Sequence, residues 1–551
     1  MARNVVIGPP GTGKTTYLMG EIDKMLRLGM QPKDIAFVSF SRNAISEAVA
    51  RVAAKTGRNA DEFKSFKTMH SLFYRACGFR GYTFMTRADQ RDFYANAGYG
   101  ASLEDEPIVY ADTEQGKEAA QKAGDDELAD ELASVMDPQR GDKLLTVWEY
   151  SRQRMCDLGE AIREKEVDCS VFELQLFGER YTKFKNAAAK LDHTDVLERA
   201  LKIKATTQCP VLIVDEAQDL SPLQIALVSL SVQAADDVWI AGDDDQAIYS
   251  FQGAAPDWLI SLWNNKAWTT TLLDVSHRCP EHVRVLGSAV ASRCSERIDK
   301  EYKTKHNRGS TTIRFWHEAV AAINELAPGE KAYVMARTNA FCADLCAKMY
   351  DSGIVYFAER SGGGPNPMGR EELIKAATML QDVALGQTVD ATELRLMIQR
   401  HVSTTYYHRT AVDRLKDYVT VCAEDLCAIG CLPLVDACAR DVWDVLEGKA
   451  RKRRDRRNDV DWLRRVWRAN GNAMPEPRAR VMTYHASKGS EAELVIIDTS
   501  LHGRGVHALR KGGTKADAEH RAAYVAVTRS KRDVIFLAET QAFAKARYAF
   551  R

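Results

Sequence analysis

The stretch Gly8-Pro9-Pro10-Gly11-Thr12-Gly13-Lys14-Thr15 decides the fold of this chain, because it fits the pattern GxxxxGK[ST] of a phosphate-binding loop. Glycines in such a loop let the backbone wrap a phosphate with inward-pointing N–H groups. The pattern predicts that Lys14 reaches the β- and γ-phosphates of a nucleotide and that the Thr15 hydroxyl holds Mg²⁺. The candidate nucleotide ligands of this region are Gly8, Pro9, Pro10, Gly11, Thr12, Gly13, Lys14, Thr15 and Thr16.

Strand and helix patterns alternate on both sides of this loop. An apolar run at residues 4–7 precedes it, and a helical pattern follows up to about residue 29. Further strand-like runs occupy residues 35–40, 211–214 and 238–241. Repeated strand–loop–helix units are typical of parallel sheets that are covered by helices. The sequence therefore predicts an α/β fold.

A second α/β pattern begins near residue 270. Its strand-like runs are residues 272–275, 332–336, 494–497 and 534–537. Each α/β pattern is interrupted by a mostly helical stretch, so we expect two inserted domains. The expected division is a first α/β domain at 1–75 and 191–270, a helical insertion at 76–190, a second α/β domain at 271–365 and 476–551, and a second helical insertion at 366–475.

Length and composition agree with several folded domains. The chain has 551 residues, too many for one hydrophobic core. Hydrophobic residues make up 45% and charged residues 28%, which excludes a mainly disordered or fibrous chain. With 76 Lys and Arg against 76 Asp and Glu, any site for a polyanion must be local. The absence of a long apolar run and of CxxC pairs predicts a cytoplasmic protein with reduced thiols and no membrane partner.

Two acidic residues directly follow the apolar run at 211–214. A carboxylate at the carboxyl end of a parallel strand faces the ligand crevice of an α/β sheet. Asp215 is suited to bind Mg²⁺, and Glu216 is suited to polarise an attacking water molecule. Together with the phosphate loop, this pair predicts hydrolysis of a nucleoside triphosphate.

Residues 215–219 and 242–254 resemble motifs II and III of the UvrD/Rep-type superfamily 1A DNA helicases. The resemblance extends from residue 5 to residue 537, and the other motifs of the family follow in its order. Residues 40–43 resemble motif Ia, 68–71 the next DNA-contact motif, 276–278 motif IV, 483–491 motif V and 524–529 motif VI.

This resemblance implies two RecA-like P-loop NTPase domains that use ATP and Mg²⁺. It implies that Gln246 senses the γ-phosphate and that Glu491 contacts the ribose. It also makes Arg278 and Arg529 arginine fingers, which the second α/β domain supplies. Such a guanidinium stabilises the charge of the transferring phosphoryl group and contributes about 10³–10⁵ in rate.

Three departures from the family concern the nucleotide base. His277 stands where the family has a Tyr that stacks on the base, and Thr16 stands where an Arg is frequent. Only seven residues precede Gly8, whereas the family places a glutamine-bearing adenine-recognition segment there. We therefore expect a relaxed preference among NTPs, with similar hydrolysis of ATP and GTP.

Aromatic side chains near motif III are candidates for stacking on DNA bases. By resemblance, Phe251 takes the position of a stacking aromatic, and Tyr249 lies two residues before it. A stacked base contributes about 1–3 kcal/mol without sequence preference. Gln252 replaces a usual Arg. The further DNA-binding candidates, chosen by motif position, are Phe40, Asn43, Thr68, His70, Arg337, Thr483 and His485.

Two further patterns leave alternatives open. The basic run at 449–457 fits either a contact with duplex phosphates or a solvated charged helix. The cysteines 422, 427, 431 and 438, with His401 and His408, fit either a zinc site or separate buried thiols. Because their spacing lacks paired ligands, buried thiols are the favoured interpretation.

Taken together, the motifs predict an ATP-dependent DNA helicase that moves on single-stranded DNA, and the family resemblance implies that it moves 3′→5′. Its expected partners are single-stranded DNA and junctions of single- and double-stranded DNA, and we expect a functional monomer. One alternative is a translocase that removes proteins from DNA with little unwinding. Another is an NTP-dependent switch that does not move on DNA. The sequence does not separate DNA from RNA.

Overall fold

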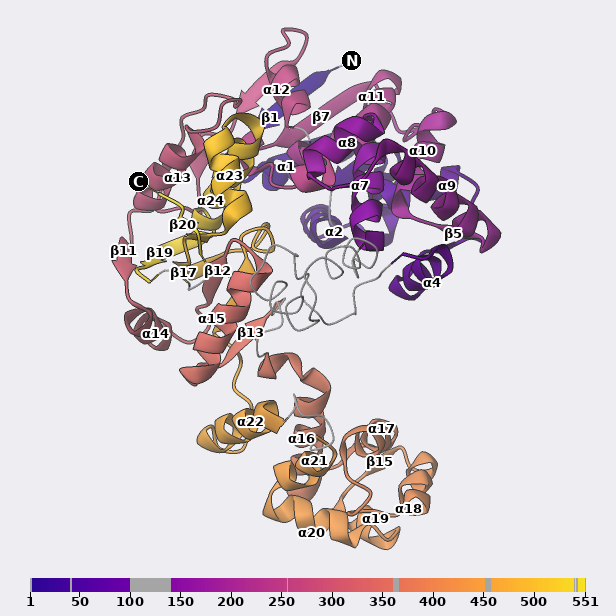
Figure 1. Ribbon diagram of the computed structural model, residues 1–551, viewed down its shortest axis with the longest axis vertical. Helices are drawn as coiled ribbons and strands as arrows, with labels where there is room; N and C mark the ends of the chain where they lie inside the picture. Colours follow the sequence, from indigo (N-terminus) through magenta and orange to yellow (C-terminus); the bar gives the residue numbers. More distant parts are fainter. Residues whose placement is uncertain are drawn as a thin grey trace, which may run out of the picture. The chain divides into compact units, whose positions relative to one another are not determined.

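The computed structural model describes residues 2–39, 42–99, 140–254, 256–359, 366–450, 457–539, 541 and 544–550. The chain divides into two compact units (Figure 1). Unit 1 comprises Met1–Ser310, His502–Arg532 and Ala549–Arg551, and unit 2 comprises Thr311–Leu501 and Asp533–Tyr548. Within the described ranges, no helix combines the length and the apolar character needed to cross a membrane.

A six-stranded sheet with the order β3-β2-β6-β7-β1-β8 forms the centre of unit 1. Every neighbouring pair in it is parallel, so the α/β prediction is confirmed for this part of the chain. The strands are β1 (Arg3–Ile7), β2 (Ile35–Ser39), β3 (Phe66–Thr68), β6 (Val211–Val214), β7 (Asp237–Gly242) and β8 (Thr269–Leu272).

Both faces of this sheet are buried. Successive side chains of a strand point to opposite faces, so Val6 packs into one core whereas Val5 and Ile7 pack into another. The first core is closed by helices α1 (Lys14–Arg27) and α2 (Arg42–Thr56). The second is closed by α3 (Met69–Ala76), α10 (His193–Lys202), α11 (Pro222–Ala234) and α12 (Asp257–Trp263).

One predicted strand belongs to a different sheet from the expected one. The run 272–275, expected as one strand of the second α/β pattern, does not form a single strand: Leu272 ends β8, which pairs in parallel with β1, and Val275 begins the separate strand β9 (Val275–Ser276). Leu272 lies beside Ile7, directly before the phosphate loop. Local hydrophobic pattern predicts that a strand forms, but it does not determine which sheet the strand joins.

Further helices of unit 1 follow the sheet in the chain. Helices α4 (Arg87–Ala97), α7 (Arg140–Arg154), α8 (Leu158–Lys165) and α9 (Val171–Ala187) share an apolar core, with the short parallel pair β4 (Thr83–Phe84) and β5 (Lys190–Leu191) beside them. The remaining elements are α13 (Glu281–Ala291), α23 (Gly503–Lys511), α24 (Gly513–Val527) and the parallel pair β9 (Val275–Ser276) and β10 (Lys303–Thr304). Helix α24 is buried and packs on α13.

Unit 2 contains a second six-stranded sheet with the order β11-β19-β17-β12-β16-β13. Its strands are β11 (Thr311–Arg314), β12 (Ala332–Ala336), β13 (Tyr356–Ala358), β16 (Ala479–Thr483), β17 (Ala492–Ile497) and β19 (Ser530–Leu537). The boundary between the two units falls within β19. Helices α14 (Trp316–Asn324) and α15 (Asn339–Asp351) pack on this sheet, and the antiparallel pair β18 (Ser500–Leu501) and β20 (Ala546–Arg547) accompanies it.

A helical part of unit 2 has its own core. In Figure 1 its helices form one orange group around the short antiparallel pair β14 (Val389–Asp390) and β15 (Thr420–Val421). Trp443 and Trp462 are fully buried in this core. The helices are α16 (Glu371–Ala384), α17 (Ala391–His401), α18 (Arg409–Asp413), α19 (Ala423–Ala428), α20 (Leu432–Arg440), α21 (Val442–Ala450) and α22 (Arg457–Ala469).

The four-part domain division stays a prediction. The contact-based units differ from it in one respect that matters for the site. Residues 271–310 and 502–532, which the sequence analysis gave to the second α/β domain, lie in unit 1 with the phosphate loop. Both predicted arginine fingers are therefore described in the same unit as Lys14.

Candidate functional site

The phosphate loop runs from the end of β1 to the start of α1. Gly11 has a φ of +73°, and a Cβ added there would lie 2.4 Å from the Cβ of Arg278. A Cβ on Gly8 would lie 2.3 Å from the Thr12 hydroxyl oxygen. Neither position has room for a side chain. The Lys14 ammonium donates to the Gly8 carbonyl at 2.7 Å, so this cation lies inside the loop at the positive N-terminal end of α1.

Thr15 and Asp215 form a pair of oxygen ligands. The Thr15 hydroxyl donates to Asp215 Oδ2 at 2.7 Å. Asp215 is buried, and burial together with the nearby charge of Glu216 raises its pKa to about 6. A buried carboxylate under this penalty is stabilised by a cation, and Mg²⁺ prefers such oxygen donors. The oxygen atoms of Thr15 and Asp215 are therefore chemically suited to the Mg²⁺ ion that the sequence predicts for them.

A chain of hydrogen bonds leads away from Glu216. This residue has a φ of +55°, in the left-handed region that is uncommon for residues with a side chain. Gln218 Nε2 donates to the Glu216 carboxylate at 2.5 Å, and Gln218 Oε1 accepts from the Asp243 backbone N–H at 3.0 Å. Gln246 Nε2 then donates to Asp243 Oδ2 at 2.7 Å, and Arg529 Nη2 donates to Gln246 Oε1 at 3.2 Å. The chain connects the predicted catalytic carboxylate with the predicted γ-phosphate sensor and one finger.

The segment at 276–278 is bonded directly to the phosphate loop. The Ser276 hydroxyl donates to the Pro10 carbonyl at 2.7 Å, and the His277 N–H donates to the Gly11 carbonyl at 2.8 Å. These bonds place the backbone of Arg278 against Gly11. The His277 side chain is exposed, and its contact with a nucleotide base stays a prediction.

Arg529 lies two residues beyond the end of α24 and is 1% exposed. Its Nε donates to the Val525 carbonyl at 2.9 Å. Burial and, next, the positive charge of Arg278 lower the pKa of Arg529 to about 10. An anionic phosphoryl group beside the guanidinium would oppose this shift, because a nearby opposite charge favours the charged form.

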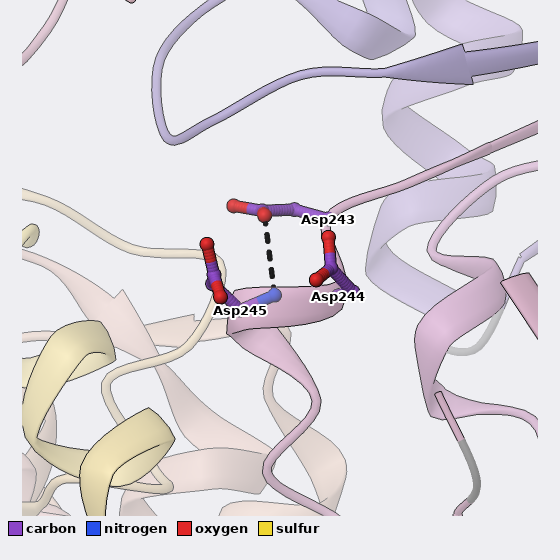
Figure 2. Close-up of side chains that lie close together, drawn as sticks. All are labelled: Asp243, Asp244 and Asp245. Carbon is purple, nitrogen blue, oxygen red and sulfur yellow. Dashed lines mark hydrogen bonds between the residues drawn. The ribbon is translucent and has the colours of Figure 1, made fainter. Parts of the chain in front are cut away.

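Three successive aspartates of motif III form a buried cluster (Figure 2). Their carboxylates surround Lys300, which lies 3.2 Å from Asp243, 2.6 Å from Asp244 and 2.7 Å from Asp245. Arg297 adds a two-pronged ion pair with Asp245 at 2.9 and 3.1 Å. Burial raises the pKa of Asp244 to about 6. These pairs fix the turn η4 (Asp244–Gln246), which carries the predicted phosphate sensor.

This cluster is a structural ion-pair group, not a metal centre. Among the described side chains it is the one group of three His, Cys, Asp or Glu residues close enough to share a metal ion. The ammonium of Lys300 already lies among the three carboxylates. Two cations against three carboxylates leave little negative charge for a divalent ion.

A pocket of about 1130 Å³ brings three of the DNA-binding candidates together, namely Thr68, His70 and Phe251. Phe251 belongs to the turn η5 (Ser250–Gln252), is 50% exposed, and lies 6.0 Å from Tyr249 between ring centres. The pocket wall carries both cations and aromatic rings. The additional cations are Arg42, Lys67 and Arg75, and the additional rings are Tyr74, Phe84, Tyr150 and His193.

His70 is held neutral in this pocket wall. Burial lowers its pKa to about 4, and the neighbouring His193, 5.3 Å away between ring centres, contributes in the same direction. Its Nε2 is buried and has no hydrogen-bond partner among the described residues. A ligand with a polar atom at this point would satisfy it.

The depressed pKa of His70 predicts a loss of stability in acid. Between pH 6.5 and about 4 the unfolded chain takes up a proton that the folded chain does not, so stability falls as the pH falls through this window. At pH 5 the contribution is about 2 kcal/mol. Urea unfolding at pH 7 and pH 5 should show a smaller acid loss for His70→Gln than for wild type. The exposed-histidine variant His507→Gln should behave as wild type, and equal losses in all three proteins would contradict the assignment.

Three of the candidates in unit 2 lie at the carboxyl edge of its sheet, whereas the fourth, Glu491, precedes a strand at the opposite edge. Arg337 directly follows β12, and Thr483 ends β16, where it is in register with Ala336. His485 lies two residues further on, in a turn in which the Ala486 N–H donates to the Thr483 hydroxyl. Glu491 is exposed in the loop before β17. The ribose contact of Glu491 and the DNA contacts of the other three stay predictions.

Several candidates lie outside the described residues. Phe40 is one of them, as is the side chain of Asn43. The basic run at 449–457 falls on side chains that are also outside this set. The described cysteines are all free thiols, and Cys431 and Cys438 are buried.

Sequence reasoning missed most of the pocket wall. Tyr74 could have been found, because it follows His70 by four residues on α3 and so shares its helix face. Tyr150 and His193 carry no motif and lie far from His70 in the chain, so no local signal identifies them. Gln218 was quoted within motif II, but its role in the hydrogen-bond chain depends on its contact with Asp243.

The parallel sheet, the phosphate loop and the carboxylates after β6 define a nucleotide-binding protein of the P-loop class. Residues 2–266 match the model of the UvrD/REP helicase N-terminal domain. Residues 2–266 are therefore similar to the N-terminal domain of UvrD/REP helicases, and this match confirms the resemblance seen in the sequence.

Individual relatives are distant. YjcD of Bacillus subtilis is 22% identical over 383 residues, which cover 65% of this chain and 47% of YjcD. The ATP-dependent DNA helicase Rep of Escherichia coli is 28% identical over 266 residues, 47% of this chain and 36% of Rep. The ATP-dependent DNA helicase UvrD2 of Mycobacterium bovis is 23% identical over 419 residues, 69% of this chain and 56% of UvrD2. The chain spans about half the length of these curated relatives.

Proposed function

We propose that this protein is an ATP-dependent DNA helicase that moves 3′→5′ on single-stranded DNA and couples ATP hydrolysis to duplex unwinding. The observation that carries this proposal is the hydrogen-bond chain from Glu216 to Gln246 and Arg529. Gln246 precedes Tyr249 by three residues and Phe251 by five. We infer that a conformational change at the nucleotide site moves the aromatic turn of the pocket, because only a short segment of chain separates the two.

Each side chain of the nucleotide site has a defined task in hydrolysis. Lys14 binds the β- and γ-phosphates, and Thr15 with Asp215 would hold Mg²⁺, which neutralises phosphate charge when bound. Glu216 orients and polarises the attacking water. Arg278 and Arg529 stabilise the charge that spreads over the phosphoryl oxygens. His277 is the residue placed to contact the base.

The pocket around Phe251 fits single-stranded nucleic acid. Non-specific binding of a single strand needs rings for stacking and cations for the phosphates, and the pocket wall offers both. The unsatisfied Nε2 of His70 adds a polar contact point. We assign single-stranded DNA and its junctions with duplex DNA as the partners, and a cytoplasmic monomer as the functional form.

Strand separation on tailed duplexes tests the proposal. With ATP and Mg²⁺, we expect unwinding of a duplex that has only a 3′ single-stranded tail and none of a duplex that has only a 5′ tail. Lys14→Ala should unwind neither, since it lacks the phosphate-binding ammonium. Unwinding from the 5′ tail alone would refute the polarity. DNA-stimulated hydrolysis without strand separation would instead support a translocase that removes proteins from DNA.

A further inference from the structure

The turn that carries Phe251 has few contacts of its own. Within η5 the Gln252 N–H donates to the Tyr249 carbonyl at 2.8 Å, and the Gly253 N–H donates to the Ser250 carbonyl at 2.9 Å. A three-residue 3₁₀ turn cannot satisfy its own last carbonyls. Half of the Phe251 side chain is exposed, and its ring lies 6.0 Å from that of Tyr249 between ring centres. Elements outside the turn also contact it.

Lys165, the last residue of α8, supplies one such contact. Its ammonium donates to the Phe251 carbonyl, which is the position that a cation caps at the end of a helical turn. The same ammonium lies 4.0 Å from the ring centre of Tyr150, close enough for a cation–π interaction. Tyr150 belongs to α7 and lines the pocket. Lys165 thus joins the aromatic turn to two helices outside the sheet.

Helix α7 supports the turn from its other end. Gly253 has a φ of +96°, and a Cβ there would lie 3.3 Å from Arg154 Cγ and 3.4 Å from Gln153 Cβ. Gln153 is itself fixed, because its Oε1 accepts from Ser221 at 2.7 Å and its Nε2 donates to Thr194 at 2.9 Å. The turn therefore lies between a rigid support at Gly253 and the ammonium at Phe251.

The charge of Lys165 suits this task at neutral pH. Burial lowers the pKa of Lys165 to about 8, so the ammonium form still predominates at pH 7. An ammonium makes a stronger hydrogen bond to a carbonyl than a neutral amine does. The side chain is partly buried between the turn and Tyr150, where water competes less for it.

We propose that Lys165 is a positioning residue that holds Phe251 in the orientation that stacks on a DNA base. The inference rests on the proposed function, because it assumes that Phe251 contacts single-stranded DNA. Lys165 does not touch the DNA in this account. Its effect on DNA binding passes entirely through the turn.

A double-mutant cycle on the full-length chain tests this role. The measured quantities are the oligo-dT concentration that gives half-maximal stimulation of ATP hydrolysis and the turnover at saturating oligo-dT. Lys165→Met is expected to raise the half-maximal oligo-dT concentration about 5–10-fold, because a misoriented ring loses part of its stacking free energy. Turnover at saturating oligo-dT should not change. Lys165→Arg should restore most of the affinity, since a guanidinium also donates to a carbonyl and binds a ring face. The exposed-lysine variant Lys183→Met should match wild type.

The decisive comparison is made in the Phe251→Ala background. If Lys165 acts through Phe251, Lys165→Met has no further effect there, and the two substitutions are not additive. An equal effect of Lys165→Met in both backgrounds, or no effect in either, overturns the inference while leaving the proposed function intact. Unchanged oligo-dT dependence in Phe251→Ala alone overturns the DNA site and this inference with it. Circular dichroism of each variant excludes unfolding as the cause.

Discussion

Replacing Arg529 by alanine is expected to lower the turnover of ATP hydrolysis by about 10³–10⁵-fold. The reason lies in the charge balance of the site. Arg529 is buried, bonded to Gln246, and repelled by the positive charge of Arg278. We expect its guanidinium to stabilise negative charge on the terminal phosphate as that charge develops. Steady-state phosphate release at saturating ATP and DNA measures the effect.

Two further variants distinguish a catalytic from a structural role for Arg529. Arg529→Lys keeps the charge but loses the planar fork, so we expect partial turnover. Arg510→Ala removes an exposed arginine of α23 and should match wild type. Binding of a non-hydrolysable ATP analogue should persist in Arg529→Ala. Turnover of Arg529→Ala within tenfold of wild type would rule out the finger role.

Replacing Glu216 by glutamine is expected to lower turnover by about 10²–10⁴-fold while ATP binding is retained. Glutamine has the same shape as glutamate, and its Oε1 can still accept the hydrogen bond from Gln218. The chain to Gln246 is therefore preserved, but the group that polarises water is lost. Single-turnover hydrolysis together with binding of labelled ATP separates the two effects.

The control for this substitution is Glu164→Gln, which changes an exposed glutamate of α8. It should hydrolyse ATP at the wild-type rate. If Glu216→Gln also retains the wild-type rate, the attacking water is activated by another group, and the role assigned to Glu216 fails.

Local patterns predicted the elements that begin the fold. The phosphate loop was recognised from eight consecutive residues, which include its glycines and Lys14. The apolar runs at 211–214 and 332–336 coincide with β6 and β12. Such short buried strands are recognised from composition because both of their faces are apolar. The run at 272–275 was expected in the second sheet, but its Leu272 ends β8 in the first sheet, because strand pairing is a long-range property that the residues of a strand do not encode.

The site was predicted where the family motifs apply and missed where contacts are made by isolated residues. Resemblance alone named Arg278 and Arg529, and the structure places both in one unit with Gln246. No sequence pattern indicated the contact of Lys165 with the Phe251 carbonyl, because every residue carries a backbone carbonyl and none is marked as the acceptor. Lys300 was likewise missed, although the three acids of motif III made a cationic partner necessary.

The central claim is that the nucleotide site responds to a single strand bound at the Phe251 turn. It is tested most directly by ATP turnover of wild type and Phe251→Ala across a titration with oligo-dT. We predict strong stimulation of wild type, about a tenfold higher half-maximal concentration for Phe251→Ala, and equal turnover of both without DNA. Turnover of wild type that is the same with and without oligo-dT would contradict the account.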